Sequence, residues 1–244
     1  MPLRVKVRVG MHAARTGPES SAVEPAAMRG DGGAQGVIGF YSSKPDRKFR
    51  EFSNFYDGAP YEFNLPEFAC SPGFPNKVAC EFSEKAIMLS KAALMKDLGS
   101  FKKISECTDP RTTKALGRGV SPWNQELWDE HLEEVAFQVV LQKFAASEAL
   151  RDVLLSTGDH ILAEATKNDC IWGIGIDIDD DRVQDPEQWI GRNVLGHALM
   201  RARAHLRGAG RGDRDAAVAE AQHAAHPIKA ADDAAMETVV SASP

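Results

Sequence analysis

Cysteine and histidine are scarce in this chain of 244 residues, and neither is spaced like a set of metal ligands. The four cysteines have no CxxC spacing, and the seven histidines include no HExxH motif. These absences argue against a zinc site and a disulfide scaffold, and they favour reduced thiols inside a cell. The GxSxG motif of many serine hydrolases is also missing. We therefore expect neither a metal ion nor another cofactor.

Long apolar segments are missing as well. No run is long enough to span a bilayer, and the N-terminus lacks the apolar core of a secretory signal. Several basic residues precede the first acid, Glu19, so the sequence is compatible with a transit peptide. Residues 3–9, however, alternate between apolar and basic side chains, which is more typical of a short strand. The sequence predicts an intracellular, cytoplasmic protein without membrane contact, and it leaves a nuclear or mitochondrial location open.

The chain has no excess of positive charge. Its formal net charge of −6 argues against a whole-protein footprint for duplex DNA, although a local basic pocket remains possible. The acidic run 177–181 has Arg182 and Gln188 where a calcium-binding EF-hand loop needs glycine and glutamate. We therefore interpret that run as a solvated loop.

What is present is the composition of a globular protein, with 43% hydrophobic and 26% charged residues. Residues 1–36 are rich in Gly, Ser, Ala and Pro towards their end, which predicts a flexible N-terminal extension. Residues 37–207 are expected to form a single compact domain. Residues 208–244 have few large apolar side chains and are expected to form a mobile tail. We expect the protein to be a monomer.

Within that domain the sequence predicts an α+β fold, dominated by helices and completed by a small β-sheet. Apolar runs and alternation favour short strands at 37–41, 61–65 and 160–165. Four prolines exclude a long helix between residues 57 and 77. Helical spacing of apolar residues and helix-start signals predict helices over 83–94, 101–107, 112–116, 124–144, 147–156 and 193–206.

The helix that begins near Ser83 has little polar surface, so we expect it to be buried. Ser83 is expected to cap it, and Glu84 then lies in the first turn, beside free backbone N–H groups. Glu84 is either a carboxylate that interacts with the helix dipole or a catalytic carboxylate in a partly dry pocket. Position alone does not separate the two.

A second group lies at the end of the last predicted strand and in the loop after it, in the segment AEATKNDCIWGIG. Glu164, Asp169, Trp172 and Gly173 could place a carboxylate beside an aromatic ring that stacks on a base or a sugar. The alternative is a core tryptophan and a turn aspartate, and both are common.

Five segments of the chain resemble successive motifs of one protein family, the NADAR or YbiA-like family. They are FYSSKPDRKFREFSNFY (40–56), SEKAIMLSKA (83–92), KALGR (114–118), LLSTGDHILAEATKNDCIWGIG (154–175) and WIGRNVLGHALMRAR (189–203). The segments occur in the family's order and extend over nearly all of residues 37–207. The resemblance implies a compact YbiA-like domain and N-glycosidase chemistry, the hydrolysis of a bond between ribose C1 and nitrogen.

The resemblance also implies which substrates to consider. They are ADP-ribosylated guanine in nucleic acid and phosphoribosylamino-pyrimidine intermediates of riboflavin synthesis. We favour the first, because Lys44, Arg47, Lys48 and Arg50 put positive charge near the expected pocket mouth. The alternative to an enzyme is a binding module that holds ADP-ribose or NAD without turnover.

Site residues follow from the same resemblance. The matches to family motifs are Glu84, Asn54, Trp128, Asp169, Trp172 and Asn193. Lys85 stands where the family usually has histidine or glutamine.

These residues suggest a mechanism. Glu84 and Asp169 are expected to form a catalytic pair whose pKa values differ, so that one carboxyl donates a proton to the leaving nitrogen. Trp128 and Trp172 would stack on the leaving base or cap the pocket.

Phosphate would be bound by Arg118 and Lys44, and Asn193 would complete the substrate site. A lysine that attacks ribose C1 and forms a Schiff base is a second route, with Lys44, Lys85 and Lys91 as candidates.

Overall fold

A computed structural model describes residues 36–209 and 218–219 of the chain. The strand expected at residues 3–9, the rest of the N-terminal extension and nearly all of the C-terminal tail lie outside the described residues.

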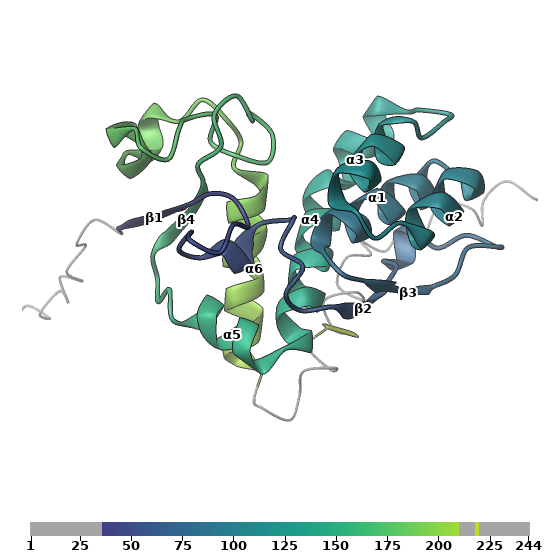
Figure 1. Cartoon of the computed structure of the whole chain (residues 1–244), viewed down its shortest axis with the longest axis horizontal. Coiled ribbons are helices and arrows are strands. Elements are labelled where there is room, and N and C mark those ends of the chain that lie inside the picture. Colours follow the sequence, from purple (N-terminus) through teal and green to yellow (C-terminus); the bar gives the residue numbers. More distant parts are fainter. Residues whose placement is uncertain (1–35, 210–217, 220–244) are drawn as a thin grey trace, which may run out of the picture. The chain divides into compact units, whose positions relative to one another are not determined.

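The longest helix, α4 (Gln125–Ala146), lies at the centre of the described fold (Figure 1). Asn124 begins it by accepting a hydrogen bond from the backbone N–H of Leu127 at 3.0 Å. Ser147 ends α4 and caps the next helix, α5 (Glu148–Leu155), close to the start of the helix predicted over 147–156. Helix α6 (Val194–Gly208) packs along α4 and makes its most extensive contact there.

Two strands distant in the sequence form a parallel pair. Strand β1 (Val37–Phe40) lies beside β4 (Ile161–Glu164), with Phe40 opposite Glu164. Because the strands are parallel, the segments that follow them leave from the same edge of the pair. This edge is where the pocket described below opens.

The second strand pair is antiparallel and joins β2 (Tyr61–Asn64) to β3 (Lys77–Cys80). Strand β3 leads into helix α1 (Ser83–Leu94), which packs against α2 (Leu98–Glu106) and α3 (Pro110–Arg118). Figure 1 shows these three helices grouped beside α4. Short 3₁₀ turns complete the fold at Arg50–Phe52 (η1), Glu67–Ala69 (η2), Asp181–Gln184 (η3) and Pro186–Gln188 (η4).

Two large hydrophobic clusters form the core. The first joins β1 and η1 to α4, α5 and α6, and the second joins α1 and α2 to β2 and α4. Trp128 and Trp172 are half-buried and contact both clusters. The two rings therefore lie where the halves of the core meet.

The predicted helix-dominated α+β fold is confirmed, with one refinement and one missed strand. In the part of the chain that the structure describes, the small sheet is two separate two-stranded pairs. Strand β3 was not predicted, because it has only four residues, of which Cys80 alone is fully buried, and so short a segment carries little signal.

Three helix starts differ from the prediction. Helix α2 begins at Leu98 instead of residue 101, and Asp97 caps it by accepting from the Ser100 N–H at 2.9 Å. Ser83 does not cap α1, because it is itself the first helical residue, and Phe82 precedes it in extended backbone without a side-chain cap.

Helix α3 begins earlier than expected, at Pro110. Asp109 caps it by accepting from the Thr112 N–H at 2.7 Å, and proline is well suited to the first helical position.

Within the described residues, none of the helices combines the length and the apolar character needed to cross a membrane.

Candidate active site

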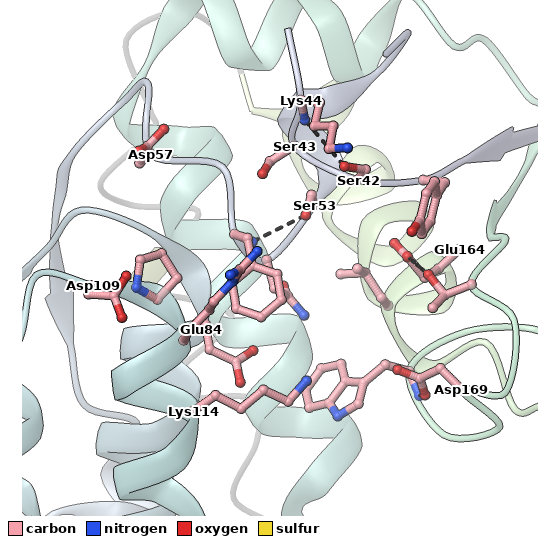
Figure 2. Close-up of a pocket in the computed structure, with 18 residues that line it drawn as sticks. Ser42, Ser43, Lys44, Ser53, Asp57, Glu84, Asp109, Lys114, Glu164 and Asp169 are labelled. Atoms are coloured by element: carbon pink, nitrogen blue, oxygen red, sulfur yellow. Dashed lines mark hydrogen bonds between the residues drawn. The ribbon is translucent and has the colours of Figure 1, made fainter. Parts of the chain in front are cut away.

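A pocket of about 520 Å³ opens at the edge where β1 and β4 end (Figure 2). Its lining comes from the turn after β1, the segment after η1, the starts of α1, α3 and α6, and the end of β4 with the loop that follows it. These segments are far apart in the sequence. The parallel strand pair and the packing of α1 against α3 and α4 bring them together.

Glu84 lines this pocket from the first turn of α1 and is only 5% exposed. Its backbone N–H donates to the carbonyl oxygen of Asn54 at 2.9 Å, which ties the start of α1 to another wall of the pocket. Burial raises the pKa of the Glu84 carboxyl above its usual value. The positive charge of Lys114 opposes that shift, and the negative charge of Asp169 adds to it.

Glu164 lines the same pocket from the last position of β4, and it is 9% exposed. Burial raises its pKa to about 7. The hydroxyl of Thr166 donates to its carboxyl and lowers the pKa, whereas the nearby charge of Asp169 raises it. A carboxyl group with a pKa near 7 can hold a proton at neutral pH and give it up during a reaction.

Asp169 also lines the pocket, but one of its oxygens has a structural task. Oδ1 accepts hydrogen bonds from the backbone N–H groups of Ile171, Trp172 and Gly173, at 3.2, 2.9 and 3.4 Å. The side chain thereby shapes the turn that carries Trp172. Close packing supports the same turn, because a Cβ atom on Gly173 would lie 2.7 Å from the carbonyl oxygen of Glu164.

Of the eight site residues that the sequence suggested, five line the pocket. They are Lys44, Asn54, Glu84, Asp169 and Trp172. Figure 2 shows Lys44 above the cavity, with Glu84 and Asp169 on its two sides.

The other three, Arg118, Trp128 and Asn193, lie outside the lining. Arg118 is exposed at the end of α3 and adds positive charge near Glu84. The Trp128 ring is 6.1 Å from that of Trp123, at the junction of the two core clusters.

Asn193 is only 1% exposed and holds β4 in place. Its Oδ1 accepts from the Glu164 N–H at 3.1 Å, and its Nδ2 donates to the Leu162 carbonyl at 2.8 Å. Asn193 precedes α6, as expected, but its side chain makes no capping hydrogen bond, because it is engaged with β4.

The lysines considered for Schiff-base chemistry are in different surroundings. Lys85 is buried and donates to Glu81 at 2.9 Å, away from the pocket lining. The ammonium of Lys91 lies 4.3 Å from the centre of the Trp123 ring, and burial lowers its pKa. Of the three, Lys44 alone is part of the lining.

Sequence reasoning missed two important pocket residues. Lys114 extends from α3 past Glu84 towards the side that carries Asp169, and its ammonium lies 5.4 Å from the Phe55 ring (Figure 2). Its signal was present in the KALGR motif. Glu164 was noticed beside Asp169 but was not assigned a catalytic role, because its burial depends on pairing with β1.

In residues 36–209 and 218–219, no group of three or more His, Cys, Asp or Glu side chains could hold a metal ion. The pocket contains two buried carboxyl groups with cations nearby, a combination that suits acid–base hydrolysis of a glycosidic bond.

Comparisons with known proteins agree with this class. The family model described as NADAR domain matches residues 39–207. The chain is 35% identical to N-glycosidase R617 of Acanthamoeba polyphaga mimivirus over 144 residues, which is 59% of this chain and 82% of that protein. It is 35% identical to protein irg-1 of Caenorhabditis elegans over 161 residues, 64% of this chain and 74% of the relative.

A solved structure is similar as well. The NMR structure of the Escherichia coli protein YbiA superimposes with a TM-score of 0.53 at 26% identity, and the match covers 71% of this chain and 86% of YbiA. The chain belongs to the NADAR family.

Proposed function

We propose that this protein is an N-glycosidase that hydrolyses the bond between a ribose C1 and a nitrogen atom. The observation that carries the proposal is the presence of two buried carboxyl groups, Glu84 and Glu164, in one polar pocket. The names of two relatives, N-glycosidase R617 and N-glycosidase YbiA, support it.

Glu84 is the group that stabilises the ribose as positive charge develops on it. Lys114, Arg118 and Lys91 all lower the pKa of this carboxyl, so they favour its ionised form against the effect of burial. An ionised Glu84 can face an oxocarbenium-like ribose and accept a proton from the attacking water.

Glu164 is the proton donor in this mechanism. As water attacks C1 and the C1–N bond breaks, the proton on Glu164 passes to the leaving nitrogen, which departs as a neutral base. Burial is the main cause of the raised pKa of Glu164, and the charge of Asp169 adds to it, so that a substantial fraction of this carboxyl holds its proton at neutral pH. This assignment replaces the pair of Glu84 and Asp169 suggested by the sequence.

Other lining residues bind the substrate. Trp172 stacks on the base or caps the sugar, and Asn54 meets the ribose hydroxyls. Lys44 binds a phosphate group.

Three residues act from outside the lining. Asn193 supports the backbone of Glu164. Trp128 packs where the two core clusters meet, and Arg118 supplies positive charge near Glu84.

The preferred substrate is ADP-ribosylated guanine in nucleic acid. The turn that ends in Lys44 continues into an exposed basic stretch with Arg47 and Lys48, which suits a phosphate-rich polymer. The pocket volume also falls within the range of nucleotide-sized ligand sites. A phosphoribosylamino-pyrimidine is the smaller alternative, since it too has a phosphate and a ribose C1–N bond.

A turnover assay separates these possibilities. Wild type, Glu84→Gln and Glu164→Gln would each be given a guanine-ADP-ribosylated oligonucleotide and, separately, a phosphoribosylamino-pyrimidine. We expect wild type to release ADP-ribose from the oligonucleotide, and each variant to be about 10²-fold to 10⁴-fold slower, as for loss of a general acid or base.

Each other outcome has a distinct meaning. Cleavage of the pyrimidine alone would assign the protein to metabolite hydrolysis. No turnover of either compound, with ADP-ribose still bound in calorimetry, would contradict an enzymatic role and favour a binding module.

A further inference from the structure

Lys143 is a buried lysine that the mechanism above does not use. It projects from α4, is 2% exposed, and does not line the pocket. Its Nζ donates to the carbonyl oxygens of Glu51 at 2.6 Å and Ser53 at 3.1 Å. The rings of Tyr56 and Phe144 each lie 5.3 Å from the ammonium. Lysine is almost never this buried unless its ammonium group is paired.

The two carbonyl groups belong to a short irregular segment, residues 49–56. Phe49 enters it with a left-handed φ of 57°, the turn η1 follows, and the Ser53 N–H donates to the Arg50 carbonyl at 3.2 Å. Lys143 bonds to the carbonyl before Phe52 and to the one after it. It therefore ties both sides of this turn to α4.

That segment continues directly into the pocket. Ser53, Asn54 and Phe55 all contribute to the lining. The Asn54 carbonyl accepts the Glu84 N–H at 2.9 Å. An unbroken series of contacts thus runs from Lys143 through Ser53 and Asn54 to the first turn of α1, which carries Glu84.

We propose that Lys143 is a positioning residue, which holds Asn54 and the start of α1 where the pocket needs them. The inference rests on the proposed N-glycosidase function. A methionine of similar length could fill the same apolar space without the cost of burying an ammonium group. What the lysine adds is its pair of hydrogen bonds to the backbone beside Asn54.

Burial lowers the pKa of Lys143 to about 7, and the charge of Glu51 opposes the shift. The amine can donate to both carbonyls whether or not it carries the extra proton. The positioning role therefore does not depend on its charge alone.

The test compares Lys143→Met with a matched control, Arg151→Met. Arg151 is also buried and also donates to two backbone carbonyls, of Leu206 at 2.7 Å and Ala209 at 2.6 Å, but neither residue lines the pocket. At a temperature where both variants are folded by circular dichroism, kcat/KM should fall about 10-fold to 100-fold in Lys143→Met. In Arg151→Met it should stay within about twofold of wild type, since that site is remote from the pocket.

A double-mutant cycle shows whether Lys143 acts through Asn54. In an Asn54→Ala background, Lys143→Met should cost much less than it does alone, because the two changes disturb one wall of the pocket. Additive losses, or an equal loss in Arg151→Met, would overturn the proposal.

Hydrogen exchange gives a readout that needs no turnover. Protection of the Glu84 amide should fall about tenfold in Lys143→Met and stay unchanged in Arg151→Met. If wild type has no glycosidase activity, the proposed function fails, but the exchange result still decides the role of Lys143. If Lys143→Met does not fold, Lys143→Leu, which likewise has no N–H donor, is compared in the same way, and unchanged exchange there would equally contradict the proposal.

Discussion

Among single residues, Glu164 gives the most direct test of the proposed mechanism, because its carboxyl is the proposed proton donor. Its carboxyl is buried at the end of β4 and has a pKa of about 7. The proton donor is the form present below that pH. Activity that needs this proton should therefore decline as the pH rises through about 7.

We expect kcat/KM to fall about tenfold for each pH unit above the pKa of Glu164. The acid limb of the profile should reflect Glu84, which must be ionised and whose pKa is raised above its usual value. The measurement is kcat/KM between pH 5 and 9 for wild type and Glu164→Gln. In Glu164→Gln, the slow residual activity should no longer decline at high pH. If it still declines as in wild type, a group other than Glu164 causes the decline.

At the scale of elements, the contact between α6 and β4 determines where Glu164 lies. Gly196 lies in the first turns of α6, where an added Cβ atom would collide with the Leu162 carbonyl oxygen and the side-chain amide of Asn193. The same amide bonds to Leu162 and Glu164. A methyl group at this position would therefore push α6 away from β4.

Gly196→Ala should lower the free energy of unfolding by about 1–3 kcal/mol, the typical cost of overpacking. The sign is opposite to the usual gain from replacing glycine by alanine in a helix. Gly99→Ala in α2 is the matched control, because its Cβ would be an ordinary 3.5 Å from the Asp97 carboxylate. Urea unfolding of both variants measures the difference, and a Gly196→Ala protein as stable as Gly99→Ala would contradict the close packing.

The elements also show how far the sequence could predict the structure. Apolar periodicity was sufficient for α4 and α6, and Glu84 was correctly placed in the first turn of α1. The burial of Glu164 was not predictable, because it depends on β1, at the other end of the domain sequence. Lys114 was missed for the same reason, since the approach of α3 to Glu84 is a tertiary contact.

Asn193 illustrates a limit of local reasoning. Its position before a helix suggested a capping side chain, and the motif resemblance suggested a substrate-site residue, but the side chain makes no capping hydrogen bond. The structure instead uses both ends of its amide to satisfy the buried backbone of β4. No local pattern reveals a hydrogen-bond partner that is distant in the sequence.

For the molecule as a whole, the buried carboxyl groups make stability depend on pH. The pKa of Glu164 is raised from 4.5 to about 7 on folding, so its stabilising contribution is complete below 4.5 and is lost as the pH rises through 7. Glu84 has a shift in the same direction.

We therefore expect the free energy of unfolding to decrease between pH 5 and pH 7. Glu164→Gln, which cannot ionise, should remove a part of that decrease on the order of 2 kcal/mol. Urea unfolding at the two pH values measures it. If wild type and variant have the same pH dependence, Glu164 is not buried as described.

The parallel pairing of β1 with β4 also affects the order in which the protein is made and folded. During synthesis β1 emerges early, and its partner emerges only after α1 to α5 have been translated. Closing so large a loop is entropically costly, and such non-local contacts form slowly. The helical part of the chain can therefore begin to fold on the ribosome, whereas the pocket is completed only after β4 and the turn with Asp169 have emerged.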